Sequence, residues 1–390
     1  MPVQPNYIVT VGMGKEGSWG SAAVPTVFLS TSAPVFTEKQ VSIFDKGLRG
    51  IRSETQAFSF GAGHSEANIP GMPWYGDDSP NLVMAMLGTD TLTGTGAKAG
   101  TIGAAAAAAT SLTYTLTGGA APLANDVFKV VDAINGNQII TPSAVSGAGP
   151  YTLTVPAIPR AITAASVASQ LTVHTITLLN TAQPPSYTLA KYDGLNSTNA
   201  RTLAGCYFED LAIKFASSAG ITVDAKARGK MGTNVAKTTA VYATESFNVP
   251  WQGQFTVAGV SNANLIDFSL DIKAANDQIF GMNNTQSPTA AISDQLTVTG
   301  TFTVVPQDYT EFNYYINNTQ PSISVLLDNG SNQTVFQMSK CAVLDPTTLS
   351  HSGNYTTLTG TFEAISNATD GLGSNAPIRV VARNLKTAAY

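Results

Sequence analysis

Charge is scarce in this 390-residue chain: charged residues make up 12% of the sequence, against about 25% in an average protein. The formal net charge of −5 offers no basic stripe to neutralise phosphates, so the composition argues against a nucleic-acid-binding surface. Threonine, serine, asparagine and glycine fill the polar positions instead. Two interpretations stay open: a β-rich protein with an uncharged polar surface, or a protein whose surface is covered by other subunits, because charged residues are depleted in interface cores.

Cysteine is equally rare, with only Cys206 and Cys341 in the whole chain. They lie far apart, and neither has a histidine or second cysteine at metal-ligand spacing. We expect two buried free thiols and no disulfide framework, so an oxidising compartment is not required. No apolar run approaches the ~18 residues of a membrane span, and residues 1–6 lack the basic and apolar regions of a signal peptide. The sequence therefore predicts neither membrane insertion nor export.

Catalytic motifs are missing as well. The three histidines, His64, His174 and His351, are scattered, and none begins a ligand pattern. His174 lies in an alternating stretch typical of a strand, where a buried, hydrogen-bonded structural histidine is expected. Residues 12–17 match Gly-x-Gly-x-x-Gly, but no helix-forming sequence follows, so we interpret them as a turn. We predict no catalytic, cofactor-binding or metal-binding residue and do not expect an enzyme.

The clearest positive signal is a β-hairpin between Leu203 and Lys230. Apolar and polar residues alternate with period 2 on both sides of a small-residue turn at 216–220. One face suits a core and consists of Leu211, Ile213, Phe215, Ile221, Val223 and Ala225. The other face carries charges that suit water or a neighbouring subunit, and consists of Asp210, Lys214, Thr222, Asp224, Lys226 and Arg228.

One helix is predicted, beginning at Pro80 and ending before Gly88, which stands where a C′ glycine belongs. Ser79 stands at the N-cap position. The adjacent carboxylates of Asp77 and Asp78 are compatible with acid–base chemistry or a metal site, but helix capping and the helix dipole explain them more simply. The buried stripe of this helix is expected to contain Leu82, Val83, Met86 and Leu87.

Small residues dominate between about Gly94 and Ser169, where charged residues become very few. Strand-like runs occur there at 112–116, 127–131, 138–141 and 151–155. Asn135-Gly136 predicts a two-residue hairpin turn between two of these runs, and 147–150 predicts another turn. We interpret residues 97–170 as a small inserted β domain, Ig-like or similar, within a β core formed by residues 1–96 and 171–390.

Short β-like runs continue on both sides of that segment. Before it they occur at 7–11, 27–29, 40–44 and 57–60, and after it they extend from residue 172 to the C-terminus at the spacing of a β-sandwich or barrel. The polar stretch between the third and fourth of these runs is either a long loop or the arm of a hairpin. Its charged residues are Lys46, Arg49, Arg52 and Glu54.

The order of these features resembles the tail tube proteins of long-tailed phages. The early Glu-x-x-Trp/Tyr-Gly motif of that family corresponds to Glu16–Gly20, and Pro25 follows it. A short helix ending in Leu-Gly, a strand containing His174, and a Gly-Cys hairpin closing with Gly-Lys then follow in sequence. A Thr-Gly-Thr-Phe strand at 299–302 and an aspartate-aromatic helical segment at 307–312 complete the series. The resemblance covers most of the chain outside about 97–170, a segment longer than the minimal family pattern needs.

The resemblance implies a mainly-β protein, with a β-sandwich or barrel-like tail tube fold, one short flanking α-helix and an inserted small β domain. Such proteins form hexameric rings in which a sheet from each subunit closes into a continuous inner barrel, which removes exposed sheet edges. Stacked rings make the tube through which the genome passes, and a neutral or acidic wall suits that passage. The implied location is the virion tail, after assembly in the host cytoplasm.

The implied partners are further copies of the chain, other tail proteins, and double-stranded DNA that passes without specific binding; no cofactor and no membrane are expected. Lys46, Arg49, Arg52 and Glu54 are the predicted self-assembly residues, as an inter-subunit or inter-ring arm. The inserted domain is expected on the outside of the tube.

Two other functions are compatible with the sequence. One is another virion structural component, such as a decoration or tail-tip protein, which copy number in a purified particle would distinguish because a tube subunit is abundant. The other is a secreted β-sandwich adhesin or carbohydrate-binding module, against which the missing export signal and the missing aromatic-rich platform count.

Overall fold

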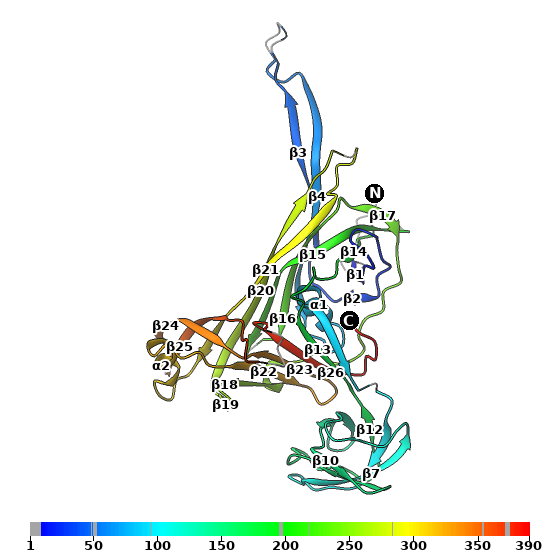
Figure 1. The fold of residues 1–390 in the computed structure, drawn as a ribbon, viewed down its shortest axis with the longest axis vertical. Coiled ribbons are helices and arrows are strands. Elements are labelled where there is room, and N and C mark those ends of the chain that lie inside the picture. Colours follow the sequence, from blue (N-terminus) through cyan, green and yellow to red (C-terminus); the bar gives the residue numbers. More distant parts are fainter. Residues whose placement is uncertain are drawn as a thin grey trace.

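The computed structural model describes residues 9–47, 49, 53–94, 96–194, 198–217, 219–282, 284–352, 355–370 and 375–390. Strands account for 53% of the structure and helices for 5%, so the mainly-β prediction is confirmed. Three sheets contain the strands (Figure 1). The described chain has two short α-helices, α1 (Pro80–Leu87) and α2 (Thr310–Ile316), rather than the single flanking helix of the predicted fold, and one 3-10 turn, η2 (Pro250–Gln252).

The largest sheet has twelve strands and contains the predicted hairpin at 203–230 and the possible hairpin around the polar stretch at 46–54. Its main path runs β2-β1-β14-β15-β20-β21-β25-β24, with β16, β17, β4 and β3 joined beside β15. The bounds are β1 (Thr10–Lys15), β2 (Val27–Leu29), β3 (Val35–Asp45), β4 (Ala57–Pro73), β14 (Tyr187–Tyr192), β15 (Asn199–Ala216), β16 (Thr222–Gly229), β17 (Thr233–Ala236), β20 (Leu265–Ile279), β21 (Ala290–Val304), β24 (Cys341–Ser352) and β25 (Tyr355–Ala364).

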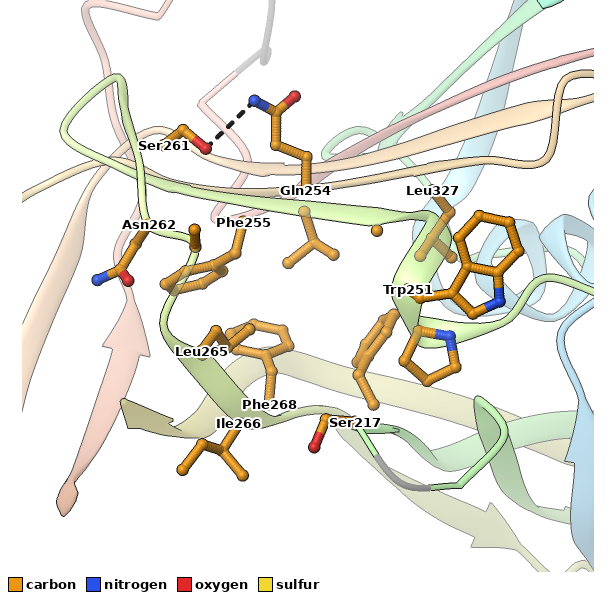
Figure 2. A pocket seen from close by; sticks show the side chains of 15 residues that line it. Ser217, Trp251, Gln254, Phe255, Ser261, Asn262, Leu265, Ile266, Phe268 and Leu327 are labelled. Carbon is orange, nitrogen blue, oxygen red and sulfur yellow. Dashed lines mark hydrogen bonds between the residues drawn. The ribbon is translucent and has the colours of Figure 1, made fainter. Parts of the chain in front are cut away.

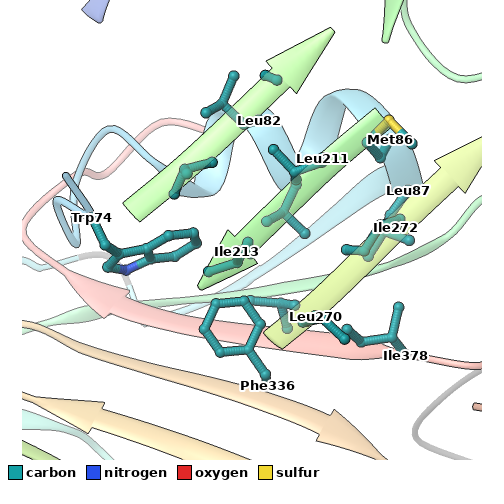
Figure 3. Packing of buried hydrophobic residues seen from close by; sticks show 14 of the residues in the cluster. Trp74, Leu82, Met86, Leu87, Leu211, Ile213, Leu270, Ile272, Phe336 and Ile378 are labelled. Atoms are coloured by element: carbon teal, nitrogen blue, oxygen red, sulfur yellow. The ribbon is translucent and has the colours of Figure 1, made fainter. Parts of the chain in front are cut away.

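A second sheet of seven strands packs against the first, and the two enclose one large hydrophobic core. Its strands are β5 (Gly88–Thr93), β13 (Thr172–Leu178), β18 (Gly253–Val257), β19 (Val260–Ser261), β22 (Ile323–Asp328), β23 (Gln333–Met338) and β26 (Arg379–Asn384). Figure 3 shows side chains of both sheets meeting, with Leu270 of the first near Phe336 of the second. This arrangement is a β-sandwich, in which inner faces interdigitate.

The hairpin prediction at 203–230 is confirmed as the antiparallel pair β15–β16, although β15 begins earlier than expected. Every residue assigned to the core face is buried, and Leu211 lies opposite Ala225 as Ile213 does opposite Val223. A β-bulge between Phe208 and Asp210 shifts the register. Strand β15 also pairs with β20, and Leu211 lies opposite Ile272 in that pair. The buried face of the sheet therefore continues from β15 into β20.

The predicted helix forms, and all eight of its residues are buried, more than the predicted stripe. Gly88 adopts φ 95°, the left-handed conformation that glycine supplies at a helix C-terminus. Ser79 is the N-cap residue and Pro80 opens the helix, as predicted, but no side chain makes a capping hydrogen bond to α1. The Ser79 hydroxyl instead accepts a hydrogen bond from the Tyr75 N–H at 2.9 Å.

The glycine-rich segment near the N-terminus is also not the predicted turn. Gly12 and Gly14 lie inside strand β1, paired with β14 and, on the other side, with β2. A Cβ on Gly12 would lie 2.7 Å from the Pro25 Cβ, and one on Gly14 would lie 2.5 Å from the Val24 carbonyl oxygen. These glycines therefore permit the chain at 24–25 to cross closely over the strand.

The segment after residue 96 forms a third sheet with its own hydrophobic cluster, which includes Tyr114 and Phe128. Its strands are β6 (Ala99–Ile102), β7 (Ser111–Gly118), β8 (Phe128–Val131), β9 (Gln138–Ile140), β10 (Ala144–Ser146), β11 (Tyr151–Thr154) and β12 (Ser166–Gln170). The turn between β8 and β9 is longer than the predicted two residues. The Asp132 carboxylate organises it by accepting backbone hydrogen bonds from Ile134 and Asn135 at 2.9 and 3.0 Å.

Candidate self-assembly surface

The β3–β4 hairpin projects from the body of the molecule (Figure 1). The two strands are paired from Val35–Asn68 at the root to Asp45–Ala57 near the tip. At the root, the Gly63 N–H donates to the Gln286 carbonyl oxygen at 2.8 Å. The loop between β20 and β21 thus holds the base of the hairpin.

The outer half of this hairpin presents large apolar side chains on both faces. Phe44, Phe58 and Phe60 form one cluster, which we call the aromatic face, with ring centroids 5.2 Å apart for the first pair and 4.7 Å for the second. They are 49–53% exposed. Val41 and Ile43 lie on the opposite face and are more than half exposed. They lie over Gly61, where a Cβ would be 3.1 Å from Ile43 Cδ1.

An apolar ribbon of this kind requires a partner. A two-stranded hairpin is marginally stable in water at best, and contiguous exposed apolar surface marks an interaction site. We therefore regard the outer half of the β3–β4 hairpin as the candidate assembly surface. Sequence analysis missed it because Ser42 and Ser59 interrupt the apolar runs, and only the register brings the phenylalanines together.

Of the predicted self-assembly residues, Lys46, Arg49 and Glu54 lie at the tip of the same hairpin, between its two arms. Lys46 Nζ lies 2.7 Å from Glu54 Oε1, and Arg49 pairs with Asp45. Arg52 lies outside the described residues. The structure thus brings Lys46 and Glu54 together in an exposed ion pair, which contributes little to the stability of a single chain.

A second surface is the face of the large sheet that points away from the core. By register its charged side chains include the basic Lys214, Lys226, Arg228 and Lys273 and the acidic Glu66, Asp210, Asp224, Asp267, Asp271, Asp345 and Glu363. Threonines of β21 and β25 fill most of the remaining positions. Three of the basic groups are in ion pairs: Lys214 with Asp224 at 3.1 Å, Lys226 with Asp210 at 3.2 Å, and Arg228 with Glu209 at 3.2 Å. This polar sheet face is therefore mildly acidic and largely self-neutralised.

A third feature is an apolar pocket of about 380 Å³ at one end of the sandwich (Figure 2). Phe268 of β20 and Phe255 of β18 contribute to its lining and are nearly fully buried. Trp251 of η2 stands beside them and is 77% exposed. The pocket is an opening into the core between the two sheets, which we call the open end.

Two of the motifs that carried the family resemblance, the Glu16–Gly20 motif and the Gly-Cys hairpin, meet in one buried junction. The Glu16 carboxylate accepts hydrogen bonds from the N–H groups of Gly20 and Gly205, both at 2.8 Å, and from the hydroxyls of Ser186 and Thr188, both at 2.7 Å. Trp19 donates from Nε1 to the Gly205 carbonyl oxygen at 3.1 Å. The junction fixes the N-terminal segment against β14 and β15.

Glycine is required at the centre of this junction. Gly205 has φ +66°, and a Cβ there would lie 3.0 Å from the Trp19 ring. Lys230 completes the contact, with its Nζ 4.5 Å from the centroid of the same ring. The motif with Glu16 and Trp19 lies far in sequence from the hairpin with Gly205 and Lys230, so their contact explains why the two motifs occur together, which sequence spacing alone does not.

Asp77, for which a catalytic or metal role was considered, lies in a polar cluster instead. Burial, together with the nearby carboxylates of Glu245 and Asp78, raises the pKa of Asp77 to about 6. Glu245 accepts a hydrogen bond from Asn332 at 2.9 Å and pairs with Lys129 of the third sheet at 3.5 Å. Asp77 therefore adjoins the contact between the third sheet and the sandwich.

Replacing Asp77 by asparagine should stabilise the protein at high pH. The pKa of about 6 in the folded protein lies above the usual aspartate value of 3.8, so ionisation of Asp77 opposes folding. The penalty is absent below about pH 4, grows as the pH rises towards 6, and is complete above it. We expect Asp77→Asn to raise the free energy of unfolding by about 3 kcal/mol at pH 8 and hardly at all at pH 4. Urea denaturation at both pH values tests this, with the exposed Asp267→Asn as control; an equal effect at both would contradict it.

The remaining chemistry-bearing groups are structural. His174 is fully buried, with Nδ1 2.9 Å from Asp90 Oδ2 and Nε2 2.8 Å from the Lys386 carbonyl oxygen, as predicted for a structural histidine. Cys206 and Cys341 are buried free thiols, also as predicted, and burial raises the pKa of each. Among the described residues, no three histidine, cysteine or acidic side chains are grouped so as to hold a metal ion. Nor does the described chain contain a helix long and apolar enough to cross a membrane.

The sandwich, the projecting apolar hairpin and the polar sheet face define a mainly-β structural protein. A comparison with protein families identifies it more closely: the family model for phage tail tube proteins matches residues 8–364. The chain belongs to this family, and the match runs across the third sheet. A search of curated proteins returned no match. Membership supports a structural role in the tail tube and a location in the virion tail.

Proposed function

We propose that this protein assembles into hexameric rings that stack into the phage tail tube, the conduit for genome delivery. The observation that carries the proposal is the β3–β4 hairpin, whose outer half exposes five large apolar side chains that nothing in the described chain covers. Because the family is that of tail tube proteins, the partner is another copy of the same chain. Ring assembly takes place in the host cytoplasm, and other tail proteins contact the ends of the tube.

In this proposal the polar sheet face lines the lumen. Its acidic excess and its paired basic groups leave few free cations to hold the phosphates of passing DNA. Double-stranded DNA therefore slides through without specific binding. Residues 97–170 form an inserted domain on the outside of the tube, an assignment supported by their separate sheet and separate hydrophobic cluster.

Electron microscopy of the purified protein tests the proposal. Hollow tubes of stacked rings with a lumen wide enough for duplex DNA are the expected result. Discrete subunits without any polymer, across a range of salt and protein concentrations, would contradict it. Copy number in purified particles separates a tube subunit from a decoration or tail-tip protein, since only the tube subunit is abundant.

The charged tip of the hairpin should also take part in assembly. We expect Arg49→Glu together with Arg52→Glu to reduce tube formation strongly, because two basic groups of the segment between β3 and β4 become acidic, and the substitution at Arg49 also removes its ion pair with Asp45. Sedimentation and electron microscopy measure the polymer, and Arg160→Glu on the third sheet is the control. Unchanged tubes would remove these residues from the assembly surface.

A further inference from the structure

We propose that the aromatic face of the β3–β4 hairpin inserts into the open end of the sandwich of a second copy. This inference rests on the proposed function and specifies which two surfaces form the contact between successive copies. The inserted group is Phe44, Phe58 and Phe60, and the receiving pocket is the one that Trp251, Phe255 and Phe268 help to line.

The two surfaces lie at opposite ends of the same sheet. Strand β20 begins at the pocket with Leu265 and ends at Ile279, directly before the loop whose Gln286 holds the hairpin root. Fifteen residues of strand span roughly 50 Å. Figure 1 shows the same separation, with the hairpin at the top and β18 and β19 at the opposite, lower edge of the sandwich. The hairpin therefore cannot reach the pocket of its own chain.

Because the hairpin and the pocket lie at opposite ends of the large sheet, the contact between two copies has a direction. Each copy offers one hairpin and one pocket, so the contact is head-to-tail, and each junction leaves a free hairpin at one end and a free pocket at the other. Such a heterologous contact propagates a filament unless the rotation closes it. Stacking of rings along an axis is the kind of assembly that this geometry produces.

The chemistry of the two surfaces also matches. None of the fifteen described residues lining the pocket carries a charge. The aromatic face can therefore enter the pocket without burying an unpaired charge. The lining offers Phe255, Phe268 and Trp251, and aromatic rings favour edge-to-face or offset contacts with one another. Insertion would cover surface that both partners otherwise expose: three half-exposed phenylalanines and a tryptophan that is 77% exposed.

Two variants separate the surfaces. Phe44→Ser with Phe58→Ser removes the inserted group, and Ala263→Trp fills the pocket from its exposed rim. Each should lower tube formation at least about tenfold, because a buried phenylalanine contributes more than a tenfold change in an equilibrium constant. Ile134→Ser and Ala121→Trp, both in exposed loops between strands of the third sheet, are the matched controls and should assemble normally. Unchanged circular dichroism spectra confirm that each variant is folded.

Mixing the two defective variants provides the decisive measurement. The hairpin variant retains an intact pocket and the pocket variant an intact hairpin, so a mixture can form one junction and no more. Light scattering should show assemblies of about twice the mass of either variant alone, without tubes. An unchanged mass in the mixture, or tubes from either variant alone, would overturn the inference.

A photoreactive side chain at position 58 of the otherwise unaltered protein gives an independent result. In assembled tubes it should crosslink to peptides within residues 250–268 of another copy; crosslinks only to other segments would overturn the inference. Failure of the proposed function looks different. If the proposed function is wrong, the unaltered protein forms no tubes. If only the hairpin-to-pocket contact is wrong, the unaltered protein forms tubes and the pocket variant forms them too.

Discussion

Trp74→Ala should lower the free energy of unfolding by about 3–5 kcal/mol, the range for removing a large aromatic side chain from a packed core. Trp74 is fully buried and follows directly after β4. Its ring packs against Phe336 with centroids 5.0 Å apart, and its Nε1 donates to Thr334 Oγ1 at 3.4 Å. Figure 3 shows it at the meeting of the two sheets. The substitution leaves a cavity between two sheets that cannot move together without disturbing the rest of the core.

Trp251→Ala is the matched control, because the same residue type is removed from a 77% exposed position. Its cost to the single chain should stay below about 0.5 kcal/mol. Both substitutions should be measured by urea denaturation in a background carrying Phe44→Ser and Phe58→Ser, since polymerisation would otherwise add to the apparent stability. A loss below about 1 kcal/mol for Trp74→Ala would show that the two sheets do not pack around this ring.

Local features of the fold could be predicted because they depend on residues close in sequence. Period-2 alternation places Leu211 and Ile213 on one side of the β15–β16 hairpin and Asp210 and Lys214 on the other, and the register reproduces both sets. The Gly88 terminus of α1 follows from the left-handed conformation that glycine allows. Where the local signal was ambiguous, the prediction was wrong: Gly12 and Gly14 are typical of a turn, but their packing against Pro25 keeps them in a strand.

The candidate assembly surface could be predicted only in part. The charged residues at the hairpin tip stood out because they are rare in this chain, but they are the smaller part of the surface. Phe44 becomes a neighbour of Phe58 only through the β3–β4 register. The open end combines Phe255 with Phe268, which come from strands of different sheets. The phenylalanines of the hairpin and those of the open end are each brought together by tertiary contacts, which hydrophobic periodicity and composition do not reveal.

The Glu16 junction is the clearest case of such a contact, and it gives the second large effect. Glu16→Gln should lower the free energy of unfolding by about 2–4 kcal/mol, although the side chain keeps its shape. Each carboxylate oxygen accepts one hydroxyl and one backbone N–H. An amide replaces one of those acceptors with a donor. The hydroxyls of Ser186 and Thr188 can rotate, but a backbone N–H cannot.

Whichever way the new amide is oriented, the N–H of Gly20 or of Gly205 would face an NH₂ group and lose its partner in a buried site. An unpaired buried donor costs its full desolvation energy, and the hydrogen bonds lost are the stronger kind made to a charged acceptor. Glu54→Gln is the control: its side chain is 75% exposed and its contact is an exposed ion pair, so a change below about 0.5 kcal/mol is expected. Urea denaturation in the non-assembling background measures both. If Glu16→Gln proved as mild as Glu54→Gln, the four hydrogen bonds would not be what holds the N-terminal segment against β14 and β15, and the packing of Trp19 on Gly205 would have to do so alone.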